Sequence, residues 1–147
     1  MPDPSPATGP PRRVLLAYDG SAPSTRALGF ALRLVRGTGG RIWAVHAASA
    51  PATVAEPRTD EEQRREVDAI GQALSDARAR AVAEGIPFEI WLREGPAPQV
   101  LLAAAAEIDA ELLVVGTRGL RGAARLLLGS VSSAVIAHAR CPVLVVP

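Results

Sequence analysis

Short runs of aliphatic residues alternate along the chain with longer segments whose apolar positions recur every three or four residues. The short runs predict buried strands, because they are continuous, are bounded by glycine or proline, and are too short for a helix. In the first, RRVLLAYDGS, the apolar run ends in Asp-Gly-Ser, which predicts a strand followed by a turn. The predicted strands fall within residues 12–21, 40–47, 87–95, 111–116 and 141–147.

The longer segments predict helices between these strands. STRALGFALRLVRG is closed by Gly37, and its apolar residues have helical spacing. Those residues are Ala27, Leu28, Ala31, Leu32 and Val35. The other predicted helices cover residues 61–85, 97–109 and 130–140. A loop rich in proline and alanine, Ser49–Asp60, precedes the second helix, and loops of this length are often functional or mobile.

The order of elements predicts the fold class. Strands and helices alternate strictly, and the strands are continuously aliphatic instead of alternating with polar residues, which is typical of parallel sheets covered on both faces. We therefore expect an α/β fold with an open five-stranded parallel sheet and helices on both faces, similar to a Rossmann fold. A proline-rich start predicts a disordered tail over residues 1–11, followed by a single domain over residues 12–147.

Composition narrows the function. The net charge of +1 and the aromatic content of 3% argue against a nucleic-acid-binding surface. No apolar run approaches the ~20 residues of a membrane span, so we expect no membrane partner. The chain has no lysine, which excludes a standard P-loop. The single cysteine, Cys141, and the lack of a visible export signal favour a reducing cytoplasm.

The stretch GTRGLRGAARLLLGSVS, residues 116–132, contains four glycines and three arginines between a predicted strand and a predicted helix. Glycine lets a backbone approach a phosphate closely, and the start of the following helix favours anions. Ser130 and Ser132 could bind the same anion or cap the helix, and Arg118 adds positive charge. The alternative is a flexible turn with a serine cap and solvated arginines.

Polar residues follow the first two predicted strands. Asp19 could bind ribose hydroxyls or help to hold a cation, or it could form a local turn or a helix cap. His46 and His138 favour packing or helix-end roles over catalysis. Other α/β sites are excluded by pattern, because GxGxxG does not follow the first strand and GxSxG does not occur.

Together these residues resemble the universal stress protein family. Gly116, Gly119, Gly129 and Ser130 match the G-x2-G-x9-G-[S/T] nucleotide motif of that family. VLLAYDGS, AVHA, ELLVVGTRG and the C-terminal HARCPVLVVP are also similar to family segments. The similarity extends from Arg12 to Pro147 and implies a fold like that of the adenine nucleotide alpha hydrolases.

The resemblance implies a site for ATP, with Mg²⁺ or Mn²⁺ accompanying the phosphates. Asp19 would meet the ribose or the cation, Arg118 would lie beside the phosphates, and the glycines would cradle ribose and phosphates. The full set of implied nucleotide-binding residues is Ala17, Asp19, Ala47, Val115, Gly116, Arg118, Gly119, Gly129, Ser130, Val131 and Ser132. The resemblance also implies a homodimer in which the last strand pairs with its symmetry mate.

Three functions remain open. The first is an ATP-binding dimer that acts as a regulatory or sensing module in a stress response. The second is a slow ATPase or an enzyme that phosphorylates itself, although no residue is assigned a catalytic role. The third is a scaffold that binds an unidentified protein partner independently of nucleotide, with the loop Ser49–Asp60 as a candidate surface.

Overall fold

The structure is a computed structural model that describes residues 8–48, 59–117 and 129–147. Its strands are β1 (Arg13–Ala17), β2 (Arg41–Ala48), β3 (Phe88–Glu94), β4 (Leu112–Gly116) and β5 (Val143–Val146). Its helices are α1 (Ala22–Val35), α2 (Asp60–Ala83), α3 (Ala97–Glu107) and α4 (Ser130–His138). Each predicted element is present at its predicted place in the chain.

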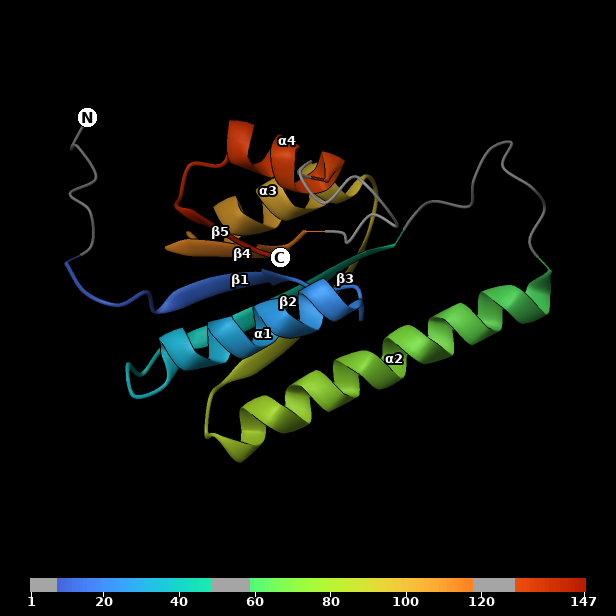
Figure 1. Cartoon of the computed structure of the whole chain (residues 1–147), viewed down its shortest axis with the longest axis horizontal. Helices are drawn as coiled ribbons and strands as arrows, with labels where there is room; N and C mark the ends of the chain where they lie inside the picture. Colours follow the sequence, from blue (N-terminus) through green and yellow to red (C-terminus); the bar gives the residue numbers. More distant parts are fainter. Residues whose placement is uncertain (1–7, 49–58, 118–128) are drawn as a thin grey trace.

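The strands form one sheet in the order β3-β2-β1-β4-β5, and every neighbouring pair is parallel. The predicted α/β fold class, with an open five-stranded parallel sheet, is confirmed. Figure 1 shows α3 and α4 on one side of the sheet and α1 and α2 on the other. From β1 the chain adds β2 and then β3 toward one edge of the sheet. It then returns to the other side of β1 and adds β4 and β5 toward the opposite edge. The strand order therefore reverses between β1 and β4.

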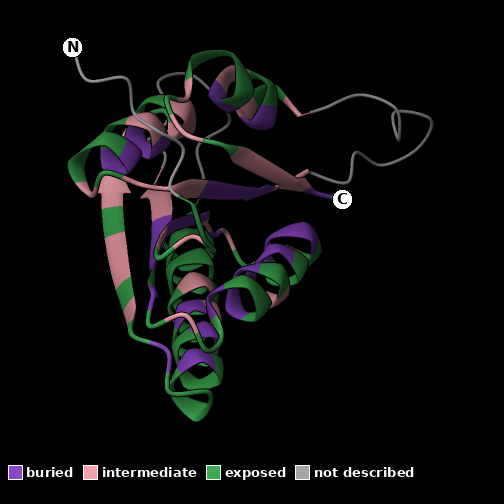
Figure 2. Ribbon diagram, turned by 90° about the vertical axis from the view of Figure 1, so that its left-hand side faces the viewer, coloured by how far each residue is buried: buried purple, intermediate pink, exposed green. Residues whose placement is uncertain are grey.

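The sheet separates two hydrophobic cores, because alternate residues of a strand point to opposite faces. In β1, Val14 and Leu16 pack with α1 and α2, whereas Leu15 packs with α3 and α4. All three side chains are 0% exposed, and burying each contributes roughly 1.5–3 kcal/mol. Figure 2 shows buried residues along the central strands and on the inward faces of the helices.

Local capping sets where the first two helices begin. The Ser21 hydroxyl accepts a hydrogen bond from the Ser24 amide, and Pro23 lies in the first turn, so α1 starts earlier than the predicted segment. Thr59 and Glu62 form a capping box at the start of α2, with bonds of 3.2 and 2.9 Å. Asp60 therefore belongs to the helix and not to the predicted loop.

A carboxylate fastens the amino end of β1 to the residue that precedes β4. Glu111 Oε2 accepts the backbone N–H groups of Arg12 at 2.7 Å and Arg13 at 2.9 Å. These two hydrogen bonds, helped by the positive charges of the same arginines, lower the pKa of the Glu111 carboxyl against the opposing effect of burial. This contact lies at the amino ends of β1 and β4, whereas the candidate site described below lies at their carboxyl ends.

The remaining sequence expectations concern the ends of the chain and its surroundings. Most of the predicted tail lies outside the described residues, so the boundary at Arg12 stays a prediction. Residues 49–58 of the predicted loop also lie outside them. Within the described ranges, no helix combines the length and the apolar character needed to cross a membrane.

Candidate functional site

The carboxyl ends of β1 and β4, where the strand order reverses, bound a region that we call the crevice. Their ladder stops at the pair Leu16 and Val114. Each strand continues for at least one more residue against its other neighbour, β1 to the pair Ala17 and Val45, and β4 to Gly116 beside β5. Ligands of open α/β sheets bind where the strand order reverses, and that point is this crevice.

The crevice is apolar on the side of α3 and α4. Ala17 and Ala47 pack against the core beneath these helices, and Val115, 2% exposed, belongs to that core. Val131, in the first turn of α4, packs against the same cluster. Four of the implied nucleotide-binding residues, drawn from β1, β2, β4 and α4, therefore belong to one apolar cluster.

The start of α1 packs closely against Gly116 on the opposite side of the sheet. A Cβ added to Gly116 would lie 2.7 Å from the Pro23 carbonyl carbon and 2.8 Å from the Ser24 nitrogen. No side chain fits there, so Gly116 is needed for helix packing whether or not a nucleotide binds. Because α1 occupies that side, the space left for a ligand lies toward α4.

Asp19 shapes the turn between β1 and α1. Its Oδ1 accepts the Ser21 N–H at 2.9 Å, which is the local turn that the sequence offered as one alternative. The helix cap is Ser21 and not Asp19. The following residue, Gly20, has a φ of +77°, a conformation that favours glycine. The carboxylate is thus held in place at the mouth of the crevice.

The two histidines form local hydrogen bonds. His46 Nδ1 lies 3.1 Å from the Tyr18 carbonyl oxygen, so Nδ1 carries the proton and donates it, tying β2 to the residue before Asp19. His138 Nδ1 bonds the Ala134 carbonyl oxygen at 2.9 Å, in the last turn of α4. The structural roles expected for both are observed. Partial burial raises the pKa of the Cys141 thiol, which packs against the α3 and α4 core.

Helix α4 begins at the same edge of the sheet without a side-chain cap. Its N-cap is Gly129, and no side chain bonds the first amide groups among the described residues. The serine cap that the sequence left open as an alternative is absent here. Ser130 is exposed in the first turn, and the buried Ser132 donates its hydroxyl to the Gly129 carbonyl at 3.0 Å. Uncapped amides at a helix start attract anionic oxygens.

Two implied residues, Arg118 and Gly119, lie outside the described residues. Of the rest, the structure gathers Ala17, Ala47, Val115 and Val131 in one apolar cluster. It places Asp19 just after β1 and Gly129 at the start of α4, both at the carboxyl ends of the strands. The sequence interpretation missed the contact of Pro23 and Ser24 with Gly116. A proline two residues after a serine cap signals a helix start but does not reveal which strand end that start touches.

Comparison with known proteins identifies the family. Residues 11–147 match the profile described as the universal stress protein family. The chain belongs to the universal stress protein family. A universal stress protein of Thermus aquaticus is 38% identical over 138 residues, which span 92% of this chain and 98% of the relative.

Solved structures of universal stress proteins share the fold over nearly the whole chain. One, in complex with cAMP, is 28% identical with a TM-score of 0.70 and covers 95% of this chain and 98% of its own. Another, from Archaeoglobus fulgidus in complex with dAMP, is 27% identical with a TM-score of 0.64 and covers 92% and 97%. Both of these family members were thus solved with adenine nucleotides.

Proposed function

We propose that this universal stress protein binds an adenine nucleotide, ATP with Mg²⁺ first among them, in the crevice between β1 and β4. The observation that carries the proposal is that Ala17, Ala47, Val115 and Val131 meet in one apolar cluster beside the uncapped start of α4. An adenine ring needs a flat apolar surface, and a phosphate chain needs backbone donors, so the two features fit the two ends of one ligand.

The proposed roles follow from position. The small side chains of Ala17 and Ala47 leave room for the base. Asp19, fixed by its bond to Ser21, would meet the ribose or the cation. Gly129 and the amides of the first turn of α4 would receive the phosphates, with Arg118 and Gly119 completing the loop as the sequence motif implies. Bound ATP would bring Mg²⁺ as the counter-charge for its phosphates.

We also propose that the protein works as a homodimer through β5 and that nucleotide occupancy is its regulatory signal, in a reducing cytoplasm. Among the described residues β5 is an edge strand that pairs with β4 alone, and Val143, Leu144 and Val145 are partly exposed. An apolar edge strand favours pairing with another chain. A short helix, α4, leads from the proposed phosphate site directly to β5. A nucleotide bound at the start of α4 would therefore change the position of β5 at the dimer interface.

Calorimetric titration of the purified protein with ATP and Mg²⁺ tests this function, with AMP, cAMP and GTP as parallel ligands. We expect saturable binding of an adenine nucleotide and no comparable binding of GTP. Asp19→Asn is a matched variant, because an amide oxygen can still accept the Ser21 N–H while the charge is lost. It should bind at least about tenfold more weakly, since hydrogen bonds to a charged group contribute about 1.5–3 kcal/mol. Absence of binding by all adenine nucleotides would refute the proposal.

A further inference from the structure

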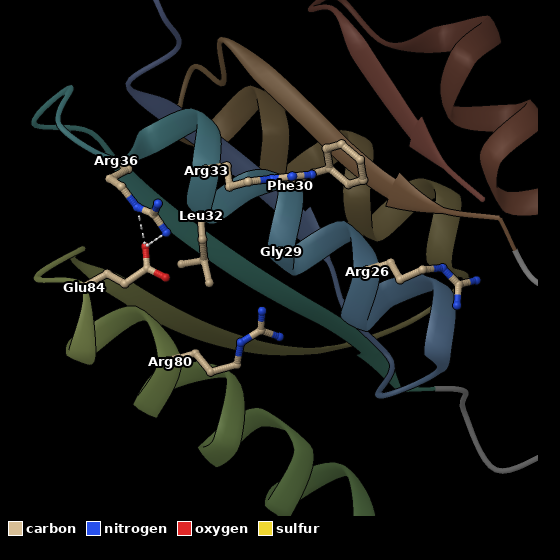
Figure 3. Close-up of a pocket in the computed structure, with 8 residues that line it drawn as sticks. All are labelled: Arg26, Gly29, Phe30, Leu32, Arg33, Arg36, Arg80 and Glu84. Carbon is tan, nitrogen blue, oxygen red and sulfur yellow. Dashed lines mark hydrogen bonds and ion pairs between the residues drawn. The ribbon is translucent and has the colours of Figure 1, made fainter.

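A groove rich in arginine lies between α1 and α2, on the face of the sheet opposite α3 and α4. Its volume is about 390 Å³, and we call it the arginine groove. Helix α1 contributes Arg26, Arg33 and Arg36 to its lining, and α2 contributes Arg80. All four arginines are exposed. Figure 3 shows Arg80 extending from α2 toward α1.

Helical spacing brings these arginines together. Arg26, Gly29, Arg33 and Arg36 recur every three or four residues, so they lie along one face of α1. The Arg80 guanidinium lies against this face, because a Cβ added to Gly29 would be 3.6 Å from its Nη2. Along the axis of α1 it is therefore level with a position between Arg26 and Arg33, which are about two turns, or ~10 Å, apart.

The two outer arginines of the groove are bonded to oxygens of the chain itself. Arg36 donates to Glu84 Oε2 from Nη2 at 2.8 Å and from Nε at 3.0 Å. Arg26 Nε donates to the Pro147 carbonyl oxygen at 2.6 Å. Among the described residues that line the groove, Glu84 alone is acidic. The donors at both ends of the groove are thus already engaged.

The two inner arginines have no such partner. Arg33 lies over the Phe30 ring, 4.3 Å from its centroid, which covers one face of the guanidinium and leaves the N–H groups at its edge able to donate. Arg80 forms no hydrogen bond or ion pair within the part of the chain that the structure describes. An anion in the groove would therefore find two guanidinium groups whose donors are not satisfied by the described residues.

The arrangement of these donors indicates the kind of anion. A guanidinium binds phosphate oxygens through two parallel N–H···O bonds. The level of Gly29, where Arg80 lies, and Arg33 are about one turn, or ~6 Å, apart along α1. A single phosphate group fills one fork, whereas linked phosphate groups carry negative charge over the whole distance. The volume of the groove also falls in the range of ~300–1,000 Å³ that is typical of sites for ligands with several groups.

We propose that the arginine groove binds a free phosphate chain, as in inorganic polyphosphate, through Arg33 and Arg80. Phe30 orients the Arg33 guanidinium, and Arg80 supplies the second fork from the facing helix. The site lies on the other face of the sheet from the proposed nucleotide site and does not depend on it. A nucleoside triphosphate with Mg²⁺ has less free charge, because the cation neutralises its phosphates, so the groove favours the chain without a cation.

Calorimetric titration with sodium tripolyphosphate, in the absence of Mg²⁺, measures this binding. Arg80→Gln and Arg33→Gln should each weaken it about tenfold or more, because each removes a pair of charge-assisted hydrogen bonds. Arg78→Gln is the matched control: it removes the same charge from an exposed position of α2 that does not line the groove. Equal affinities of Arg80→Gln and Arg78→Gln would overturn the proposal.

Nuclear magnetic resonance of the arginine Nε–H groups locates the ligand on the wild-type protein. The signals of Arg33 and Arg80 should shift along one common titration curve, and that of Arg78 should not move. A chain bound at the start of α4 instead would leave Arg33 and Arg80 unchanged and overturn the proposal. Asp19→Asn should show the same shifts as wild type, so this test does not share its outcome with the test of nucleotide binding.

Competing anions and salt test the chemistry of the ligand. Inorganic phosphate and a glutamate-rich peptide with the charge of tripolyphosphate should both bind about tenfold more weakly or less well still, since neither places linked phosphates across both forks. A peptide that binds equally well would assign the groove to an acidic protein surface and overturn the proposal. Binding of the chain should weaken between ~0.1 M and ~1 M salt, as the screening length falls from ~10 Å to ~3 Å. Binding that is insensitive to salt would contradict it.

Discussion

At the scale of single residues, Gly116 is required for the packing of β4 against the start of α1, whether or not a ligand is bound. The backbone of Pro23 and Ser24 fills the space that a side chain at Gly116 would need. A glycine in a nucleotide motif is usually interpreted through the nucleotide alone. In this protein, loss of binding in a Gly116 variant would therefore not by itself show that Gly116 contacts the nucleotide.

We predict that Gly116→Ala lowers the free energy of unfolding by about 1–3 kcal/mol in the absence of nucleotide, because β4 and α1 must move apart. Urea unfolding of the ligand-free protein measures it. Gly129→Ala is the comparison, since Gly129 has a φ of −60°, which any residue adopts, and its cost should be about 1 kcal/mol or less. Unchanged stability of Gly116→Ala would contradict the close packing described.

Glu111 supports a second prediction at this scale, on pH. Its pKa is lowered in the folded protein by the amide hydrogen bonds of Arg12 and Arg13, so it binds protons more weakly when folded than when unfolded. Its contribution is therefore fully present above the unfolded pKa of about 4.3 and is lost as the pH falls through the lower folded value. Glu111→Gln should cost about 1–2 kcal/mol at pH 7.

Unfolding curves of wild type and Glu111→Gln between pH 2 and pH 7 check this sign. The difference in the free energy of unfolding should shrink as the pH falls and vanish at the acidic end. A difference that grows toward low pH would show that the carboxylate does not accept these bonds.

At the scale of elements, α1 carries a glycine that neither its backbone conformation nor its packing requires. Gly29 lies in the helix interior, and a Cβ there would meet only the Arg80 guanidinium, at 3.6 Å, which is ordinary contact. Glycine in a helix interior costs about 0.5–1 kcal/mol relative to alanine. None of the contacts described requires glycine at this position, so Gly29 lowers the stability of α1.

Gly29→Ala should accordingly raise the free energy of unfolding by about 0.5–1 kcal/mol. Chemical denaturation followed by circular dichroism measures it. Gly71→Ala in α2 is the matched case, since no atom lies within 4 Å of its added Cβ. If Gly71→Ala stabilises and Gly29→Ala destabilises, the Arg80 guanidinium is held against Gly29 more rigidly than the 3.6 Å contact indicates.

Elements also show what the sequence can and cannot predict. The aliphatic runs predicted the strands and their parallel pairing, and helical spacing located α1 through Ala27 and Leu28. The assignment of Ala17 and Val115 to one site came from the family resemblance alone. The contact of Gly116 with Pro23 could not be predicted from the sequence. It joins segments far apart in the chain, and their approach depends on how α1 crosses the sheet. The sequence also did not predict that residues 60–69 of α2 are exposed on every face, because charged residues in a helix predict solvent exposure of one face only.

At the scale of the whole molecule, the two edges of the sheet differ. β3 ends the sheet with Glu89 and Glu94, which are exposed and charged, and charge is a common protection of an edge strand. β5 ends it with four aliphatic residues. In β5 the carbonyls of Pro142 and Val146 face β4, where they accept from Leu113 and Thr117. The N–H of Val145, one residue out of step, faces away from β4.

If β5 forms the dimer, Val145→Pro should abolish it while leaving the β4 ladder intact, because proline removes only an outward-facing donor. Native mass spectrometry measures the subunit count. Val145→Ala retains the N–H and should remain dimeric or nearly so. A dimeric Val145→Pro protein would place the interface elsewhere.

The separation of the two cores also places all of the tryptophan fluorescence on one face of the sheet. Both of its tryptophans, Trp43 and Trp91, pack on the side of the sheet that holds α3 and α4. Arg41 lies over the first ring and Arg93 over the second, so their emission is sensitive to the charge around that side. Intrinsic fluorescence should therefore respond to a ligand in the crevice and stay unchanged by events confined to the face that holds α1 and α2, so one unlabelled sample distinguishes the two faces.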